Sequence, residues 1–211
     1  MNRIRARAQA QFPSVLLTLI SIIQALALEL IWSKIIEADF LWSLDVASIV
    51  GWGMISATLM GILQIWVTYS TLVMGFTWRP MLRDSVLPFV IGIQEFMLIS
   101  LISGEFDVYW LYVLASIFVV VNYVAHTSFS RARDEPENEQ FFRVRGPATL
   151  RNFRPAIIIV SVLVLFGVLI ELLGNPTWLA LLAIFCANFV LAGQIINSRN
   201  LWHLLMDLPD E

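Results

Sequence analysis

The sequence predicts an all-α, polytopic integral membrane protein, a bundle of about six transmembrane helices with both termini in the cytoplasm. Apolar residues make up 59% of the 211 residues, whereas about 45–50% is usual for a soluble domain. Charged residues make up 14%, which is too few to cover the surface of a soluble protein. The apolar residues also gather in stretches of about 20, the length that crosses a hydrocarbon core.

The expected spans form a single transmembrane domain, 1–211, and cover residues 14–36, 46–78, 87–103, 108–130, 155–173 and 177–197. The second stretch would make a helix of about 50 Å, but no polar turn divides it, so we expect one span that overshoots the bilayer. The third is the shortest, and Pro88 near its start suits a first helical turn, where no backbone donor is needed.

The first span also resembles a secretory signal, because basic residues precede an apolar run and Ala25-Leu26-Ala27 resembles a cleavage site. The apolar character continues to Trp32, however, and this length favours an uncleaved transmembrane helix.

Basic residues predict the orientation. Of the 13 lysines and arginines, only Lys34 is a lysine. Six threaded helices place every arginine on the side of the termini, and place Lys34 on the other side. Because Lys and Arg accumulate in cytoplasmic loops, both termini are predicted to be cytoplasmic. The preference for arginine is typical of a GC-rich bacterium, and we therefore expect the bacterial inner membrane.

Tryptophans are expected in belts at the two interfaces of the membrane. Trp52 and Trp66 fall within the second span and are expected to pack inside the protein. The expected belt residues are Trp32, Trp42, Trp110 and Trp178 on the outer side and Trp78 and Trp202 on the inner side.

Residues 131–154 form the only substantial soluble segment, a cytoplasmic loop with an acidic run at 134–139 between arginine-rich flanks. A solvated, flexible loop is the commoner structure for such a segment, and a partner-docking element is the alternative. Phe141 and Phe142 are expected to dip into the membrane interface.

Glu95 is the deepest charged residue, near the middle of the third span, where a charge costs a few kcal/mol. No arginine or lysine lies at matching depth, so its expected neighbours are the polar residues Gln24, Asn122, Asn188 and His126. A structural hydrogen-bond network between helices and a proton or cation site formed by Glu95 and His126 both stay open. Glu29 and Glu171 lie nearer span ends and are expected to reach water.

Small residues predict a helix-packing face on the second span. Gly53, Ala57 and Gly61 recur every four residues, which allows another helix to approach closely. The contact is either internal or between subunits.

Other chemistry has little support in the sequence. A net charge of −3 gives no basic excess for nucleic acid. The lone Cys186 and the two histidines show no ligand spacing, so neither a metal nor a cofactor is expected. No catalytic motif occurs, such as G-x-S-x-G or a P-loop, and the protein is not expected to be an enzyme.

The layout resembles the small bacterial relatives of the endolysosomal potassium channel family. The resemblance covers most of the chain as spacing and hydropathy, including an aromatic-rich end of the second span (66–78) and the turn Gly174-Asn175-Pro176 before the last span. It implies six-helix units that assemble as tetramers around their first helices. The family's motif, Arg followed by Phe-Ser-Asp, reads Phe12-Pro13-Ser14 here, without the aspartate, and in this register the apolar constriction maps to Leu19.

Two main interpretations of function follow, and an intramembrane enzyme is a distant third. The first is an oligomeric cation channel or transporter-like protein. Its expected path residues are Leu19, Ile23, Gln24, Glu95, Asn122 and Asn188. The second is a non-conducting membrane partner or regulatory subunit that acts through its helix surfaces and the loop. The first predicts that polar groups of the first span converge on a symmetry axis, and the second that they satisfy each other within one subunit. The expected partners are the lipid bilayer, further copies of the chain in a homo-oligomer, and a cytoplasmic or membrane protein.

Overall fold

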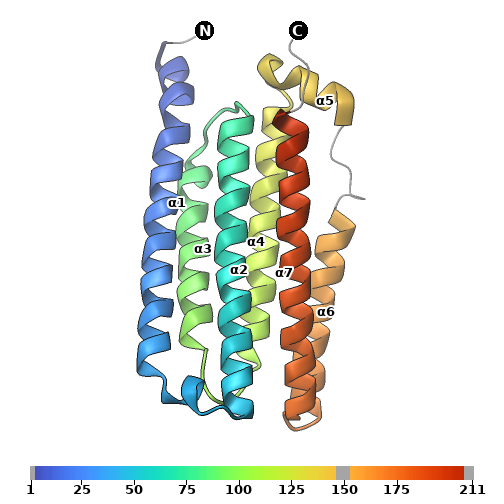
Figure 1. Cartoon of the computed structure of the whole chain (residues 1–211). Helices are drawn as coiled ribbons and strands as arrows, with labels where there is room; N and C mark the ends of the chain where they lie inside the picture. The colour runs from blue at the N-terminus through green and yellow to red at the C-terminus, as the bar shows by residue number, and fades with distance from the viewer. Residues whose placement is uncertain (1–2, 146–152, 207–211) are drawn as a thin grey trace.

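The computed structural model describes residues 3–145 and 153–206 as a bundle of long helices that run side by side (Figure 1). The elements are α1 (Arg3–Glu37), η1 (Asp39–Trp42), α2 (Val46–Gly75), α3 (Leu82–Ser100), α4 (Tyr109–Ala132), η2 (Pro136–Asn138), α5 (Glu139–Arg145), α6 (Arg154–Leu172) and α7 (Thr177–Met206).

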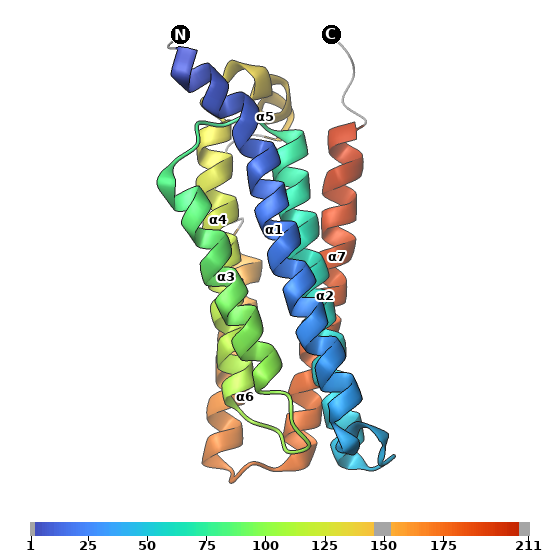
Figure 2. The same ribbon diagram turned by 90° about the vertical axis from the view of Figure 1, so that its left-hand side faces the viewer.

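The start of α1, the end of α7, the α2–α3 link and α5 lie at one end of the bundle, here called the α5 end. The short helix η1, the α3–α4 link and the α6–α7 turn lie at the other end, the η1 end (Figures 1 and 2).

Five of these helices, α1, α2, α4, α6 and α7, are long and apolar enough to cross a membrane. The expected all-α fold of a polytopic membrane protein is therefore confirmed. Helix α3, which covers most of the third expected span, packs between α1 and α4 within the bundle. It falls outside the group of five because its 19 residues include three charged ones, Arg83, Asp84 and Glu95.

Capping side chains set the starts of α2 and α3. The Asp45 carboxylate accepts a hydrogen bond of 3.0 Å from the backbone N–H of Ser48 and so caps α2. The Asp84 carboxylate accepts one of 2.9 Å from the N–H of Met81, which begins α3 at Leu82. Pro88 consequently lies inside α3, and the expectation of a first-turn proline is wrong.

Helix α2 packs most extensively against α7. A Cβ atom on Gly53 would lie 2.6 Å from Cγ2 of Ile184 in α7, so only glycine fits there. Ala57 is fully buried, whereas the position of a Cβ on Gly61 is open space. The small-residue face thus includes a close contact within the chain and, at Gly61, the wall of a cavity described below.

The tryptophans depart from the expected belts at four positions. Trp110 is fully buried and Trp78 is 5% exposed, so both pack in the protein core. Trp52 and Trp66, expected to be packing residues, are 37% and 42% exposed. Burial at a helix end depends on which face meets a neighbouring helix, and position along the chain does not report that face.

Within the described part of segment 131–154, residues 131–145 fold back onto the α5 end of the bundle. Asn138 is buried; its side chain accepts from the N–H of Thr77 and donates to the carbonyls of Thr77 and Ala132. Phe141 and Phe142 pack on Phe76, with ring centroids 4.8 Å and 5.9 Å away. Phe141 is buried in this aromatic cluster, so its expected insertion into the membrane interface is wrong. Phe142 is half-buried at the edge of the same cluster, and its insertion stays a prediction. The expectation of a flexible loop is wrong for these residues, and residues 146–152 lie outside the described part.

Candidate functional site

Glu95 of α3 is 1% exposed and pairs with Gln24 of α1. The Nε2 amide of Gln24 donates to both carboxylate oxygens, at 3.0 Å and 3.2 Å. The helices come close here because Gly92 has no side chain: a Cβ atom at that position would lie 2.7 Å from Cγ2 of Ile23. The predicted mid-membrane carboxylate therefore lies between two helices that are tightly packed one turn away.

The partner of Glu95 is an amide rather than a cation. Within the described residues, no arginine, lysine or histidine forms an ion pair with it. The Oε1 atom of Gln24 is buried and has no hydrogen-bond partner in that part of the chain. A neutral carboxylic acid can donate to an amide oxygen while the amide N–H donates back, which satisfies both groups. In the structure Nε2 faces both carboxylate oxygens, so this exchange would require the Gln24 amide to turn.

A cavity of about 40 Å³ adjoins Glu95. Its wall includes Thr58, Gly61 and Gln64 of α2 and Leu191 of α7. A buried water needs at least about 10–15 Å³ and two to four polar partners. The cavity has the volume for a water molecule beside the carboxylate, but its wall is almost entirely apolar.

A second cavity, of about 180 Å³, continues from the first toward the α5 end. The two cavities share Gln64, Phe118 and Val121 as lining residues. Polar side chains from three helices line the second cavity: Thr68, Asn122, Gln194 and Ser198. We call the two cavities together the α2–α4–α7 crevice.

Gln64 lies at the junction of the crevice. Its Nε2 donates to Ser198 Oγ at 2.7 Å and to Thr68 Oγ1 at 3.2 Å, so it links α2 to α7. Its Oε1 is buried without a partner among the described residues. Gln64 therefore has a buried acceptor that an ordered water molecule could satisfy.

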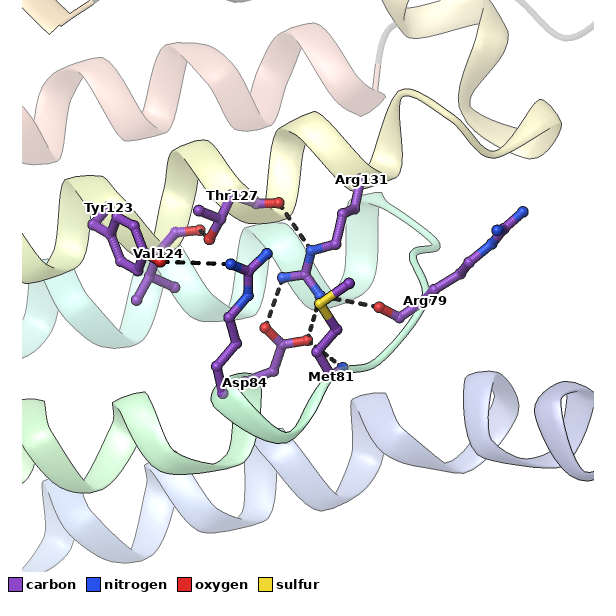
Figure 3. Close-up of polar contacts among 8 residues, drawn as sticks. Arg79, Met81, Asp84, Tyr123, Val124, Thr127 and Arg131 are labelled. Atoms are coloured by element: carbon purple, nitrogen blue, oxygen red, sulfur yellow. Dashed lines mark hydrogen bonds and ion pairs between the residues drawn. The ribbon is translucent and has the colours of Figure 1, made fainter.

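A second buried carboxylate, Asp84, lies at the start of the same helix and has a cationic partner. Its two oxygens each accept a hydrogen bond of 2.6 Å from Arg131 of α4, in a bidentate ion pair (Figure 3). Arg131 also donates to the backbone carbonyls of Thr127 and Arg79, at 3.0 Å each (Figure 3). Because these partners come from α3, α4 and the α2–α3 link, the pair joins the three elements at the α5 end.

The remaining predicted site residues lie elsewhere. Asn188 donates to the carbonyls of Gly53 and Ile184 and so contributes to α2–α7 packing. Asn122 donates to the carbonyl of Phe118 and lines the second cavity. His126 is exposed, and its ring stacks edge-on against Phe153. None of the three forms a hydrogen bond with Glu95 in the described structure.

The predicted path residues of α1 face its own neighbours. Ile23 is 6% and Gln24 is 5% exposed, and both lie against α3. Leu19 is half-buried. Ile23 and Gln24 are covered by this chain, so they present no surface to another copy.

Three functionally placed residues escaped the sequence analysis: Gln64, Asp84 and Arg131. Asp84 and Arg131 lie in segments between the expected spans, among other charged residues. They are 47 residues apart, and no local sequence pattern indicates that they form a pair. Gln64 carried a signal, because it is a lone amide in the middle of a long apolar span and polar side chains in such places need a partner.

No cluster of three or more His, Cys, Asp or Glu side chains suited to a metal ion occurs in residues 3–145 and 153–206. The site is therefore a buried carboxylate and amide beside a largely apolar crevice that has a few polar side chains, in an all-helical polytopic membrane protein. Comparisons with models of protein families, with curated proteins and with solved structures found no match for the chain.

Proposed function

We propose that this protein is a transporter-like multi-pass membrane protein in which Glu95 binds a proton or a small monovalent cation. The ion reaches Glu95 through the α2–α4–α7 crevice from the α5 end. The observation that carries the proposal is a carboxylate that is 1% exposed, has only an amide partner and forms part of a cavity wall. Ionisable groups inside membrane helices commonly belong to ion pathways and proton relays.

The distribution of basic residues supports a cytoplasmic α5 end, in the inner membrane of a bacterium. The described arginines lie at the start of α1, in the α2–α3 link, at the starts of α3 and α6, at and just after the end of α4, in α5 and in the last turns of α7. These segments lie on the α5 side of the bundle, with the start of α6 farther from its end than the others (Figure 1). Lys34 is in the last turn of α1, at the η1 end. Since positive residues favour the cytoplasmic side, the crevice opens toward the cytoplasm in this proposal.

The proposal differs from a central pore of the kind that the resemblance to the potassium channel relatives implies. Such a pore would need the polar face of α1 on a symmetry axis, whereas Ile23 and Gln24 are covered by α3. We therefore propose a path within one chain, and potassium is one candidate among the monovalent cations.

The second candidate function is a non-conducting membrane partner or regulatory subunit. The observation that favours it is the same pair, because Gln24 and Glu95 satisfy each other inside one subunit. In that case the crevice is a packing defect, and neither ion flux nor thermal stability depends on an ion bound at Glu95.

Ion flux in proteoliposomes separates these two functions. The purified protein is reconstituted, and proton, sodium and potassium uptake are each measured under an imposed membrane potential. The proposal expects uptake of one of these ions, abolished by Glu95→Gln, which keeps the shape of the side chain and removes its titration. It also expects a large reduction for Gly61→Leu, because a side chain there enters the cavity beside Glu95.

Gly193→Leu is the matched control, since Gly193 is exposed on α7 and a Cβ atom there would also meet open space. A second measurement is the thermal unfolding temperature as a function of ion concentration, because an ion that binds only the folded state at 100 times its Kd adds about 2.7 kcal/mol. Equal flux in the wild type and Glu95→Gln would overturn the proposal. So would an absence of both flux and ion-dependent stabilisation in correctly folded protein, and that result would favour the partner function.

A further inference from the structure

A separate groove lies between α4 and α6. It has a volume of about 420 Å³, and its apolar wall includes Phe118 and Val119 of α4 and Ile157 and Val160 of α6. Both helices are long and apolar enough to cross a membrane, and Val119 and Ile157 are 53% and 60% exposed. The groove therefore faces the hydrocarbon region, where the medium that fills it is lipid.

The groove changes from apolar to polar along its length. Toward the α5 end it is lined by Tyr123, His126 and Phe153, and the ring of His126 stacks on that of Phe153 with centroids 4.7 Å apart. Deeper in the bundle the wall is mostly apolar, and Ser161 of α6 is its one hydroxyl side chain among the described residues. Such a gradient matches a molecule with a polar head at the membrane surface and an apolar chain below it.

Two arginines lie close to the polar end of the groove, outside the residues that form its wall. Arg83 of α3 donates to the hydroxyl of Tyr123 at 3.5 Å, and its Nε is buried without a partner among the described residues. Arg154 is exposed in the first turn of α6. The ten described residues that line the groove include no acidic one. Basic pockets between transmembrane helices attract anionic lipid head groups.

We propose that this groove binds an anionic phospholipid. One acyl chain lies between α4 and α6, and the phosphate lies at the His126 end, where Arg83 and Arg154 attract it. The groove is distinct from the α2–α4–α7 crevice: the two lie on neighbouring faces of α4 and share Phe118 and Asn122, and Glu95 is not part of the groove wall.

The test is native mass spectrometry of the purified protein, with added phosphatidylglycerol or phosphatidylcholine of identical acyl chains. We expect phosphatidylglycerol to be retained preferentially. Each of Arg83→Gln and Arg154→Gln should weaken that retention about fivefold, the factor that corresponds to about 1 kcal/mol per basic residue. Arg199→Gln, which removes an exposed arginine of α7 outside the groove, is the matched control and should have no effect.

Filling the groove tests the acyl chain. Ser161→Trp, at an exposed position in the groove wall, should abolish the preference, and Ala156→Trp is a second variant if the first does not fold. Val164→Trp is the control on the same helix, since Val164 is 39% exposed and lies outside the groove wall. Equal retention of both lipids, or full retention in a folded groove-filling variant, would overturn the proposal. Complete displacement by inorganic phosphate would also overturn it, because the site would then recognise a free anion rather than a lipid.

Discussion

Helix α3 carries two buried carboxylates in contrasting surroundings. Asp84, 7% exposed, accepts two charged hydrogen bonds from Arg131 and one from the backbone of Met81. Glu95, 1% exposed, accepts only from the amide of Gln24 and forms part of a cavity wall. The Asp84 carboxylate has both a cationic partner and several hydrogen-bond donors. The Glu95 carboxylate has no cationic partner and only one donor group among the described residues.

The contrast sets a structural role for Asp84 beside the role proposed for Glu95. A bidentate Arg–carboxylate pair has a fixed geometry and little capacity for another ligand, so Asp84 holds α3, α4 and the α2–α3 link together. An amide partner leaves the carboxylate able to exchange a proton or accept a cation. Replacing each carboxylate by its isosteric amide therefore gives a direct measure of the difference.

The largest expected effect is that of Asp84→Asn. The substitution leaves the Arg131 guanidinium, whose side chain is only 11% exposed, without a counter-charge. Removing one partner of a buried ion pair costs about 3–5 kcal/mol, and we expect a loss of that size in the free energy of unfolding. Thermal or denaturant unfolding in detergent measures it.

Arg79→Gln is the control for that experiment. Arg79 forms an ion pair of 2.8 Å with Glu135, but its side chain is 56% exposed. Exposed ion pairs contribute at most about 1 kcal/mol. An equal loss in Asp84→Asn and Arg79→Gln would show that the Asp84–Arg131 pair is solvated, and the contrast with Glu95 would disappear.

Glu95→Gln should change stability much less, by no more than about 1 kcal/mol, because a second amide can still exchange hydrogen bonds with Gln24. Glu95→Ala should cost about 1–3 kcal/mol, since it leaves the buried amide of Gln24 without its acceptor. The same unfolding measurement tests both variants. A loss of several kcal/mol in Glu95→Gln would mean that the charge itself stabilises the fold, which would make Glu95 a second structural carboxylate.

The sequence predicts some parts of this comparison and gives no information on the others. Hydropathy predicts the long apolar helices. Because Gln24 and Glu95 both lie near the middle of their spans, they are predicted to be neighbours, and the structure has a hydrogen bond between them. The Asp84–Arg131 pair is beyond such reasoning, because nothing local distinguishes these two charges from the others in the links. The burial of Trp110 and Trp78 is equally hidden, since it depends on how helices rotate about their own axes.

The smallest effect is expected at a third carboxylate, Asp45, which lies outside the membrane-spanning helices at the start of α2. Hydrogen bonds from the Ser48 backbone N–H and the Ser43 hydroxyl lower the pKa of Asp45 below its ordinary value of 3.8. Because the pKa is lowered in the folded state, the ionised cap stabilises the protein when the pH is above the ordinary pKa of the group. This stabilisation is lost as the pH falls below that value.

Asp45→Asn keeps a capping oxygen and removes the titration. The unfolding temperature of the wild type should therefore fall more steeply than that of Asp45→Asn on acidification from about pH 6 to about pH 3, with nearly equal values at neutral pH. Parallel curves would show that the cap is equally formed in both protonation states of Asp45.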